Sequence, residues 1–172
     1  MSSDEGLAHL QLTDLPGVLR RVETPLPPGI YLRTADPAAD LPLIAEVYNA
    51  AFEFSSPGKA TPEEVARLAR HPGFSPSGVF VAFDGDLAVG LGVGSVDVPA
   101  PGGAVHRGAI ELLAIRPGYQ RRGIGRALIH AVLAWLAGQH IVTVGVSIKD
   151  PTLLTVLEKY GFRKAFPAEG GT

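Results

Sequence analysis

The stretch that most constrains the fold is RPGYQRRGIGRAL, which runs from Arg116 to Leu128. It joins an apolar run typical of a strand, residues 109–115, to an apolar run typical of a helix, residues 125–137. A strand that feeds a helix through a tight loop directs unpaired backbone N–H groups and a partial positive charge at one point. The stretch therefore predicts an anion-binding site at the start of the helix.

The residue types in the loop agree with an anion site. Gly123 and Gly125 permit backbone conformations with positive φ and carry no side chain that would keep a phosphate away. Arg121, Arg122 and Arg126 add positive charge around the same point. A pyrophosphate suits this arrangement.

The spacing argues against two commoner nucleotide-binding loops. A dinucleotide-binding fingerprint needs a third glycine, but Leu128 stands three residues after Gly125. A P-loop needs Gly-Lys followed by Ser or Thr, and the loop lacks that sequence. An unrelated nucleotide-binding module is therefore disfavoured.

The composition of the chain limits the classes of protein to which it can belong. The chain has 172 residues, 46% of them hydrophobic, which is enough to bury one core. Its formal net charge is -2, so no overall positive field indicates a nucleic-acid partner. Cysteine is absent, which excludes disulfides, thiolate metal ligands and a cysteine nucleophile. Because neither a signal-peptide core nor a run of about 20 apolar residues occurs, we expect a cytoplasmic protein without a membrane partner.

Patterning divides the chain into an N-terminal arm and linker, residues 1–28, and one domain over residues 29–172. Spaced apolar residues in the arm indicate a short helix, and TPLPPG then blocks helix continuation. The domain begins with a strand and a helix, followed by a second helix after Thr61 and a hairpin around DGD at residues 84–86. A further strand and a last helix over residues 151–160 complete it.

The second strand of the hairpin carries glycine at alternate positions. Gly90, Gly92 and Gly94 leave one face of this strand almost bare. Glycines inside a strand often mark a place where another element approaches closely. We expect a helix to pack on this face.

In its context the loop resembles the coenzyme A signature of the GNAT superfamily, the Gcn5-related N-acetyltransferases. QRRGIG follows the pattern Q/R-x-x-G-x-G/A, IRP precedes it, an amphipathic helix follows it, and LEKYGF is a frequent family ending. The resemblance covers roughly residues 30–166, and LPPGIYLRTADPAAD and HPGFSPSGVFVAF are similar to the acetyltransferase domains of mycothiol-synthase-like proteins. It implies an α/β fold with a central, mostly antiparallel mixed sheet and helices on both faces.

The resemblance also implies acetyl-coenzyme A as co-substrate, without a metal. The backbone amides of residues 121–126 would hold the pyrophosphate, and the end of the preceding strand would pair with the pantetheine arm. Asp150 stands where the family has an asparagine that contacts this arm, although a cap of the last helix is its simpler role. The residues implied to contact coenzyme A are Leu113, Ala114, Ile115, Gln120, Arg121, Arg122, Gly123, Ile124, Gly125, Arg126 and Asp150.

Glu111 is the candidate general base. Acyl transfer to an amine needs a free amine, and family relatives often place a carboxylate base on the strand before the loop, where Glu111 is the only acid. Because side chains alternate along a strand, Glu111 should share a face with Leu113, and burial among apolar neighbours would strengthen it as a base. The alternatives are a Glu111 paired with an arginine or water near the sheet end, and His106 as the base.

The proton donor departs from the family's pattern. Many relatives end in N-x-x-A-x-x-x-Y-x-x-x-G-F, whose tyrosine can protonate the leaving thiolate. Counting back from Gly161 puts Leu157 at that position. Tyr160 is a weaker candidate acid, because the helix rotates it about 60° from Leu157, and we expect it to pack on the sheet.

Two functions remain open. One is an N-acetyltransferase that acts on a primary amine of a small molecule or peptide. The other is a non-catalytic domain that binds or senses acyl-coenzyme A, which the missing tyrosine favours. GNAT domains often form dimers, so the resemblance also implies a homodimer.

Overall fold

A computed structural model describes residues 8–21, 25–36, 39–51, 63, 67, 74–97, 107–148 and 151–164. The described strands are β1 (Ala8–Leu12), β2 (Ile30–Thr34), β3 (Phe74–Asp84), β4 (Leu87–Val96), β5 (Arg107–Ile115), β6 (Thr143–Ile148) and β7 (Arg163–Lys164). The helices with described bounds are α1 (Leu15–Arg21), α2 (Leu41–Ala51), α4 (Ile124–Gly138) and α5 (Pro151–Lys159). The helix expected after Thr61 lies mostly outside the described residues.

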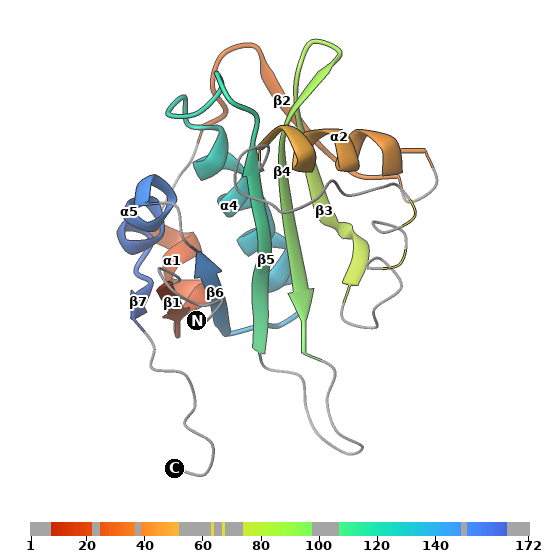
Figure 1. The fold of residues 1–172 in the computed structure, drawn as a ribbon. Coiled ribbons are helices and arrows are strands. Elements are labelled where there is room, and N and C mark those ends of the chain that lie inside the picture. Colours follow the sequence, from red (N-terminus) through yellow and green to blue (C-terminus); the bar gives the residue numbers. More distant parts are fainter. Residues whose placement is uncertain are drawn as a thin grey trace, which may run out of the picture.

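The described strands form one mixed sheet in the order β2-β3-β4-β5-β6-β1-β7 (Figure 1). Its neighbouring strands are antiparallel except β5 and β6, which are parallel and are joined by α4. Helix α2 covers one face of the sheet and α4 the other (Figure 1). The expected α/β fold, with a mostly antiparallel sheet between helices, is confirmed.

The close packing of a helix on the glycine face of β4 is also confirmed. A Cβ atom added to Gly90 would lie 2.9 Å from Leu128 Cδ1, and one added to Gly94 would lie 2.8 Å from Val132 Cγ1. Distances under 3.0 Å are too short for carbon contacts, so only glycine fits these positions against α4. The helix residues in contact with the three glycines are Ile124, Leu128, Val132 and Trp135.

The N-terminal segment differs from the expected helical arm. Its first part is strand β1, which pairs with β6 and β7, and α1 begins only after Asp14. The Asp14 side chain accepts a hydrogen bond from Gly17 N at 3.2 Å, which caps the helix start. Leu10 and Leu12 on β1 are buried in the same core cluster as Leu15 and Val18 on α1, so β1 and α1 both contribute to the core.

The hairpin and the last helix follow the sequence patterns. Gly85 has a φ of 61° in the turn between β3 and β4, a left-handed conformation that suits glycine. Leu153 and Leu157 on α5, and Tyr160 directly after it, are all buried against the core, as their spacing predicts. Among the helices that the structure describes, none combines the length and apolarity needed to cross a membrane.

Buried Asp40 forms an ion pair with partly exposed Arg33 where β2 and α2 meet. Arg33 donates two hydrogen bonds to its carboxylate, one of them at 3.0 Å, and Asp36 N donates a third at 2.7 Å. The guanidinium of Arg33 also lies 4.7 Å from the ring centre of Phe83. The hydrogen bond from Arg33 is the largest cause that lowers the pKa of Asp40. This pair joins the edge strand to the helix over it.

The substitution Gly94→Ala should destabilise the fold, because the added methyl group would overlap Val132 and Trp135. We expect a loss of about 1–3 kcal/mol in the free energy of unfolding, measured by urea titration. Gly145→Ala is the matched control, since a Cβ there meets nothing within 4 Å. Equal losses for both variants would contradict the close packing of α4 on β4.

The Asp40 pair should make stability depend on pH. Because the pKa of Asp40 is lower in the folded state, its contribution is present above the unfolded pKa of about 3.9 and is lost as the pH falls through the folded value. Asp40→Asn should therefore cost about 1–3 kcal/mol at pH 7 and less at pH 3. Urea titrations at both pH values measure this, with exposed Asp86→Asn as control. A pH-independent loss would contradict the account.

Candidate functional site

Strands β5 and β6 separate halfway along the sheet. They pair in parallel up to Ile110 and Val146. Beyond that point the last two residues of β6 pair only with β1, while β5 continues to Ile115 and pairs only with β4. Within the described part of the chain, residues 111–115 therefore have no strand partner on their β6 side. This is an open sheet edge to which an extended ligand can add.

The residues expected beside a pantetheine arm lie on this open edge. Leu113, Ala114 and Ile115 are the last three residues of β5, and all three are buried. Leu113 and Ile115 pack in the core under α4, and Ala114 packs in the core under α2. Their side chains hold the strand in place, so its backbone is what a ligand between β5 and β6 would meet.

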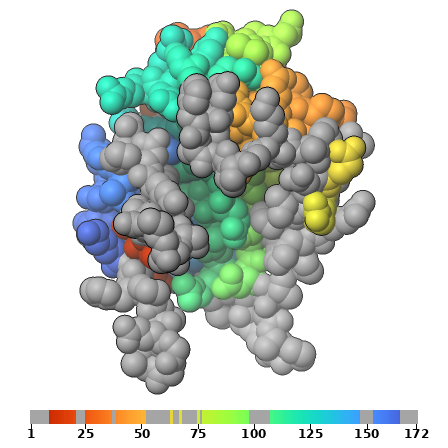
Figure 2. Space-filling model, in the orientation of Figure 1, coloured from red at the N-terminus to blue at the C-terminus, as the bar shows by residue number. Residues whose placement is uncertain are grey.

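The loop after β5 turns the chain sharply into α4. Tyr119 N donates to Arg116 O at 3.0 Å, and Gly118 has a φ of 91°, which together match a type II turn. Arg121 and Gly123 also have positive φ, at 64° and 89°. Figure 2 shows the loop exposed at the top of the molecule, next to the tip of the β3–β4 hairpin.

Helix α4 begins without a side-chain cap. Gly123 occupies the N-cap position and has no side chain to accept a hydrogen bond. The first backbone bond back to the cap comes from Ala127, whose N–H donates to Gly123 O at 3.1 Å. The N–H groups of residues 124–126 precede that bond, so their donors face the end of the helix and can bind an anion there.

The glycines of the loop have different roles. Gly123 has the positive φ expected of it. Gly125 does not: it lies inside α4, and a Cβ there would be 2.8 Å from Leu153 Cδ2. The expectation of a positive φ at Gly125 was therefore wrong, because the residue has helical backbone angles. The absence of a side chain at Gly125 instead allows Leu153 of α5 to pack against the first turn of α4.

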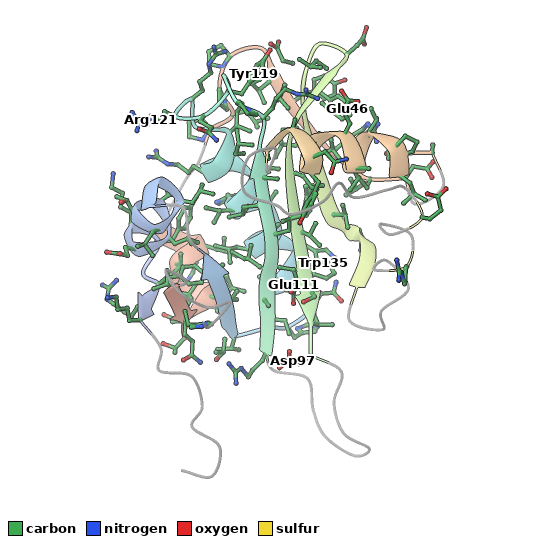
Figure 3. All side chains as sticks on the ribbon, viewed as in Figure 1. Glu46, Asp97, Glu111, Tyr119, Arg121 and Trp135 are labelled. Carbon is green, nitrogen blue, oxygen red and sulfur yellow. The ribbon has the colours of Figure 1, made fainter. Side chains whose placement is uncertain are left out.

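Most of the polar and charged side chains of the loop are exposed, so a ligand can contact them. Gln120, Arg121, Arg122 and Arg126 are exposed, whereas Ile124 is buried in the core. The guanidinium of Arg122 lies 4.9 Å from the ring centre of Tyr119, so this arginine stacks on the loop itself. Figure 3 shows Tyr119 and Arg121 at the loop end of the sheet.

The side chains of Tyr119 and Arg116 fasten the loop to the rest of the fold. The hydroxyl of Tyr119 donates to Asp84 Oδ2 at 2.8 Å, and this bond is the largest cause that raises the pKa of Tyr119. Arg116 donates to Ala88 O at 3.0 Å and to Glu46 on α2 at 2.9 Å. The loop is thus tied to the β3–β4 hairpin and to α2, unlike a turn that is only solvated.

Glu111 lies at a β-bulge in β5. Leu112 pairs with Val93 and Ile110 pairs with Gly94, which leaves Glu111 as an extra residue in the register. Ile110 and Leu113 consequently face α4 together, so Glu111 does not share the face of Leu113. That expectation was wrong, because the alternation of side chains holds only in a regular strand.

The surroundings of Glu111 also differ from the expectation. Its side chain is exposed rather than buried. Ser95 Oγ donates to Glu111 Oε1 at 2.6 Å, so its partner is a serine rather than the arginine or water expected as the alternative. Ser95 is buried on the face of β4 opposite the glycines. Glu111 therefore faces the α2 side of the sheet, farther along β5 from the loop (Figure 3).

Tyr160 is placed apart from Glu111. It is buried in the core under α4, and its hydroxyl donates to the carbonyl of Arg126 at 3.5 Å. Leu157 is fully buried in the same core. These contacts support the packing role expected for Tyr160. Asp150 and His106 lie outside the described residues.

The described residues contain no group of three His, Cys, Asp or Glu side chains that could hold a metal ion. The anion donors at α4, the open edge of β5 and the carboxylate of Glu111 are the chemical groups of the candidate site. Residues of all three were named from the sequence, and Ser95 was not. Its only sequence signal is a polar residue on a strand face otherwise occupied by Leu91 and Val93.

Comparison with known proteins identifies relatives. The chain matches the model of the acetyltransferase (GNAT) family over residues 42–162. It is 34% identical over 155 residues to a mycothiol acetyltransferase of Mycolicibacterium paratuberculosis, covering 86% of this chain and 45% of the relative. It is 32% identical over 154 residues to the mycothiol acetyltransferase of Mycobacterium avium, with the same coverage of both chains. The chain spans about half the length of these curated relatives.

Solved structures share the fold. A GCN5-related N-acetyltransferase from Sphaerobacter thermophilus aligns with a TM-score of 0.68 at 20% identity, covering 92% of this chain and 48% of that one. The NatC complex bound to Gag peptide and CoA aligns with a TM-score of 0.64 at 17% identity, covering 80% and 86%. These two structures show the shared fold, and the family match and the curated relatives show that the chain belongs to the GNAT acetyltransferase family.

Proposed function

We propose that this chain transfers an acetyl group from acetyl-coenzyme A to the primary amine of a small molecule or peptide. The observation that carries this proposal is the open edge of β5 next to the uncapped start of α4. One extended ligand with amide groups along its arm and a pyrophosphate at its end would satisfy both features. Acetyl-coenzyme A is such a ligand, and membership of the GNAT family supports it.

Coenzyme A would bind mainly through the backbone. The amides of its pantetheine arm would pair with the free edge at residues 113–115, in the manner of an added strand. Its pyrophosphate would accept hydrogen bonds from the start of α4, at residues 123–126. The exposed side chains of Gln120, Arg121 and Arg126 would contribute to the same contact, and Asp150 would reach the arm if it acts as the family's asparagine does.

Glu111 would accept the proton of the acceptor amine. An alkylamine with a pKa of ~10.4 is mostly protonated at pH 7, and freeing its lone pair costs about 4.6 kcal/mol. The carboxylate is exposed on the α2 side of the sheet, so an amine or a bridging water can reach it. The free amine then attacks the thioester carbonyl, and the carbon–sulfur bond breaks as the amide forms.

The proton for the departing thiolate would come from water. Leu157 is buried and has no proton to give, and the hydroxyl of Tyr160 is directed at the Arg126 carbonyl. A thiol is a good enough leaving group for water to serve as the acid. Tyr160 as acid is a weaker proposal, since it would first have to leave that contact.

The acceptor class is proposed from the relatives. The curated relatives are named mycothiol acetyltransferases, and one solved relative holds a peptide together with CoA. Deacetylated mycothiol and peptide N-termini are therefore the first amines to test. The homodimer and the cytoplasmic location expected from the sequence remain predictions, and light scattering after size-exclusion chromatography tests the first.

The chain should release coenzyme A thiol from acetyl-coenzyme A in the presence of its acceptor. The panel consists of deacetylated mycothiol, free amino acids, spermidine and a short peptide with a free N-terminus. Glu111→Gln should lower kcat at least about 100-fold, because the base is lost while the shape is kept. Exposed Glu158→Gln is the matched control and should retain full activity.

Two outcomes would contradict the proposal. If acetyl-coenzyme A binds in calorimetry but no acceptor raises thiol release above background hydrolysis, the chain is the acyl-coenzyme A binding or sensing domain considered from the sequence. If micromolar acetyl-coenzyme A does not bind, both functions fail. An unchanged kcat in Glu111→Gln would show that Glu111 is not the base, and it would not contradict the proposed acetyl transfer.

Gly123→Ala should weaken acetyl-coenzyme A binding about tenfold, because its φ of 89° suits glycine and the new methyl group would border the pyrophosphate. Calorimetry measures the change. Gly85→Ala is the matched control: it also has positive φ and open space, but it lies in the β3–β4 turn. We expect it to lose some stability and no affinity. An equal loss of affinity in both variants would overturn the assignment of the α4 start as the pyrophosphate site.

A further inference from the structure

Ser95 is a buried polar residue with one specific partner. Its exposed fraction is 7%, and Asp40 is the other buried polar residue in the described part of the chain. The carboxylate of Asp40 accepts hydrogen bonds from Arg33 and from the backbone N–H of Asp36, which is a structural role. The hydroxyl of Ser95 donates instead to Glu111, at 2.6 Å. Because this buried hydroxyl is hydrogen-bonded to the candidate base, we expect Ser95 to have a role in function rather than only in packing.

The β-bulge at Glu111 makes the hydrogen bond from Ser95 important. A bulged residue lies outside the regular ladder, so neighbouring strand contacts do not fix its side chain. Glu111 is also exposed, and a glutamate side chain has three rotatable bonds. Without a partner it would sample several rotamers in water, and its carboxylate would meet the acceptor in only some of them.

Ser95 is held rigidly enough to fix that side chain. It pairs with Ala109 in the middle of the sheet, where β4 is paired on both sides. Its backbone is closely packed as well, because a Cβ on Gly108 would lie 3.0 Å from Ser95 O. The short serine side chain has a single torsion before its hydroxyl, so its position follows from the strand.

We propose that Ser95 is a positioning residue for acetyl transfer, whose hydroxyl holds Oε1 of Glu111 so that Oε2 is left for the acceptor. In the reaction the proton moves from the acceptor nitrogen to Oε2, and the hydroxyl of Ser95 keeps its own proton. Ser95 touches neither substrate and acts only through the carboxylate. This inference rests on the proposed role of Glu111 as base.

The test is a double-mutant cycle with acetyl-coenzyme A and the amine of the panel that gives the highest kcat/KM. Ser95→Ala should lower kcat about tenfold, as expected for a misplaced catalytic group. The KM for acetyl-coenzyme A should stay within about twofold, since the coenzyme site lies elsewhere on β5. Ser95→Thr, which keeps the hydroxyl, should restore kcat to within about threefold.

The cycle also tests whether Ser95 works through Glu111. In the Glu111→Gln background, Ser95→Ala should cause no further loss of kcat, because the carboxylate that it positions is already gone. Ser95→Cys fills the position with a somewhat larger thiol, which is a weaker hydrogen-bond donor. It should lose kcat as Ser95→Ala does, even if the alanine variant melts early. Thermal melting of every variant separates a loss of fold from a loss of rate.

Several results would overturn the role of Ser95. One is an unchanged kcat in folded Ser95→Ala while Glu111→Gln is inactive, and another is an equal loss of kcat in both backgrounds. Failure of Ser95→Thr to recover activity while folded would do the same. If Glu111→Gln keeps its kcat, the proposed base is wrong, and this outcome is distinct because it does not depend on any Ser95 variant.

Discussion

The close contact between α4 and the glycine face of β4 determines where the candidate site lies. With Gly90, Gly92 and Gly94 beneath it, the helix packs its own side chains directly on the backbone of β4. This contact fixes the helix axis, and therefore the place where its uncapped N-terminus meets the end of β5. The contacts of Tyr119 and Arg116 then hold the connecting loop on the same end of the sheet. The position of the candidate anion site follows from the packing of the core.

Strand β5 contributes to both halves of the proposed reaction. Its last residues lose β6 as a partner after Ile110, which leaves backbone groups for a coenzyme arm. Its bulge turns Glu111 toward the α2 side, where a buried serine holds one carboxylate oxygen. Coenzyme and acceptor can therefore approach the same strand from different directions. A thioester at the open edge would lie on the same strand as the candidate base Glu111.

Local patterns in the sequence were sufficient for features that depend on local chemistry. The hairpin turn at Gly85, the bare face of β4 and the strand–loop–helix of the candidate anion site each depend on residues that are close together in the sequence. Features that depend on the register between strands could not be predicted in this way. The bulge at Glu111 exists only relative to β4, so strict alternation placed this side chain on the wrong face. Strand β1 was likewise missed, because its partners β6 and β7 come from the far end of the chain.

Coenzyme A should bind along the free edge of β5 with its pyrophosphate at the start of α4. A crystal of the protein soaked with coenzyme A would reveal where the coenzyme lies. We expect pantetheine amides hydrogen-bonded to the backbone of residues 113–115 and pyrophosphate oxygens within hydrogen-bonding distance of the N–H groups of residues 123–126. Coenzyme A bound elsewhere, or β5 and β6 paired along their whole length, would rule out this binding mode.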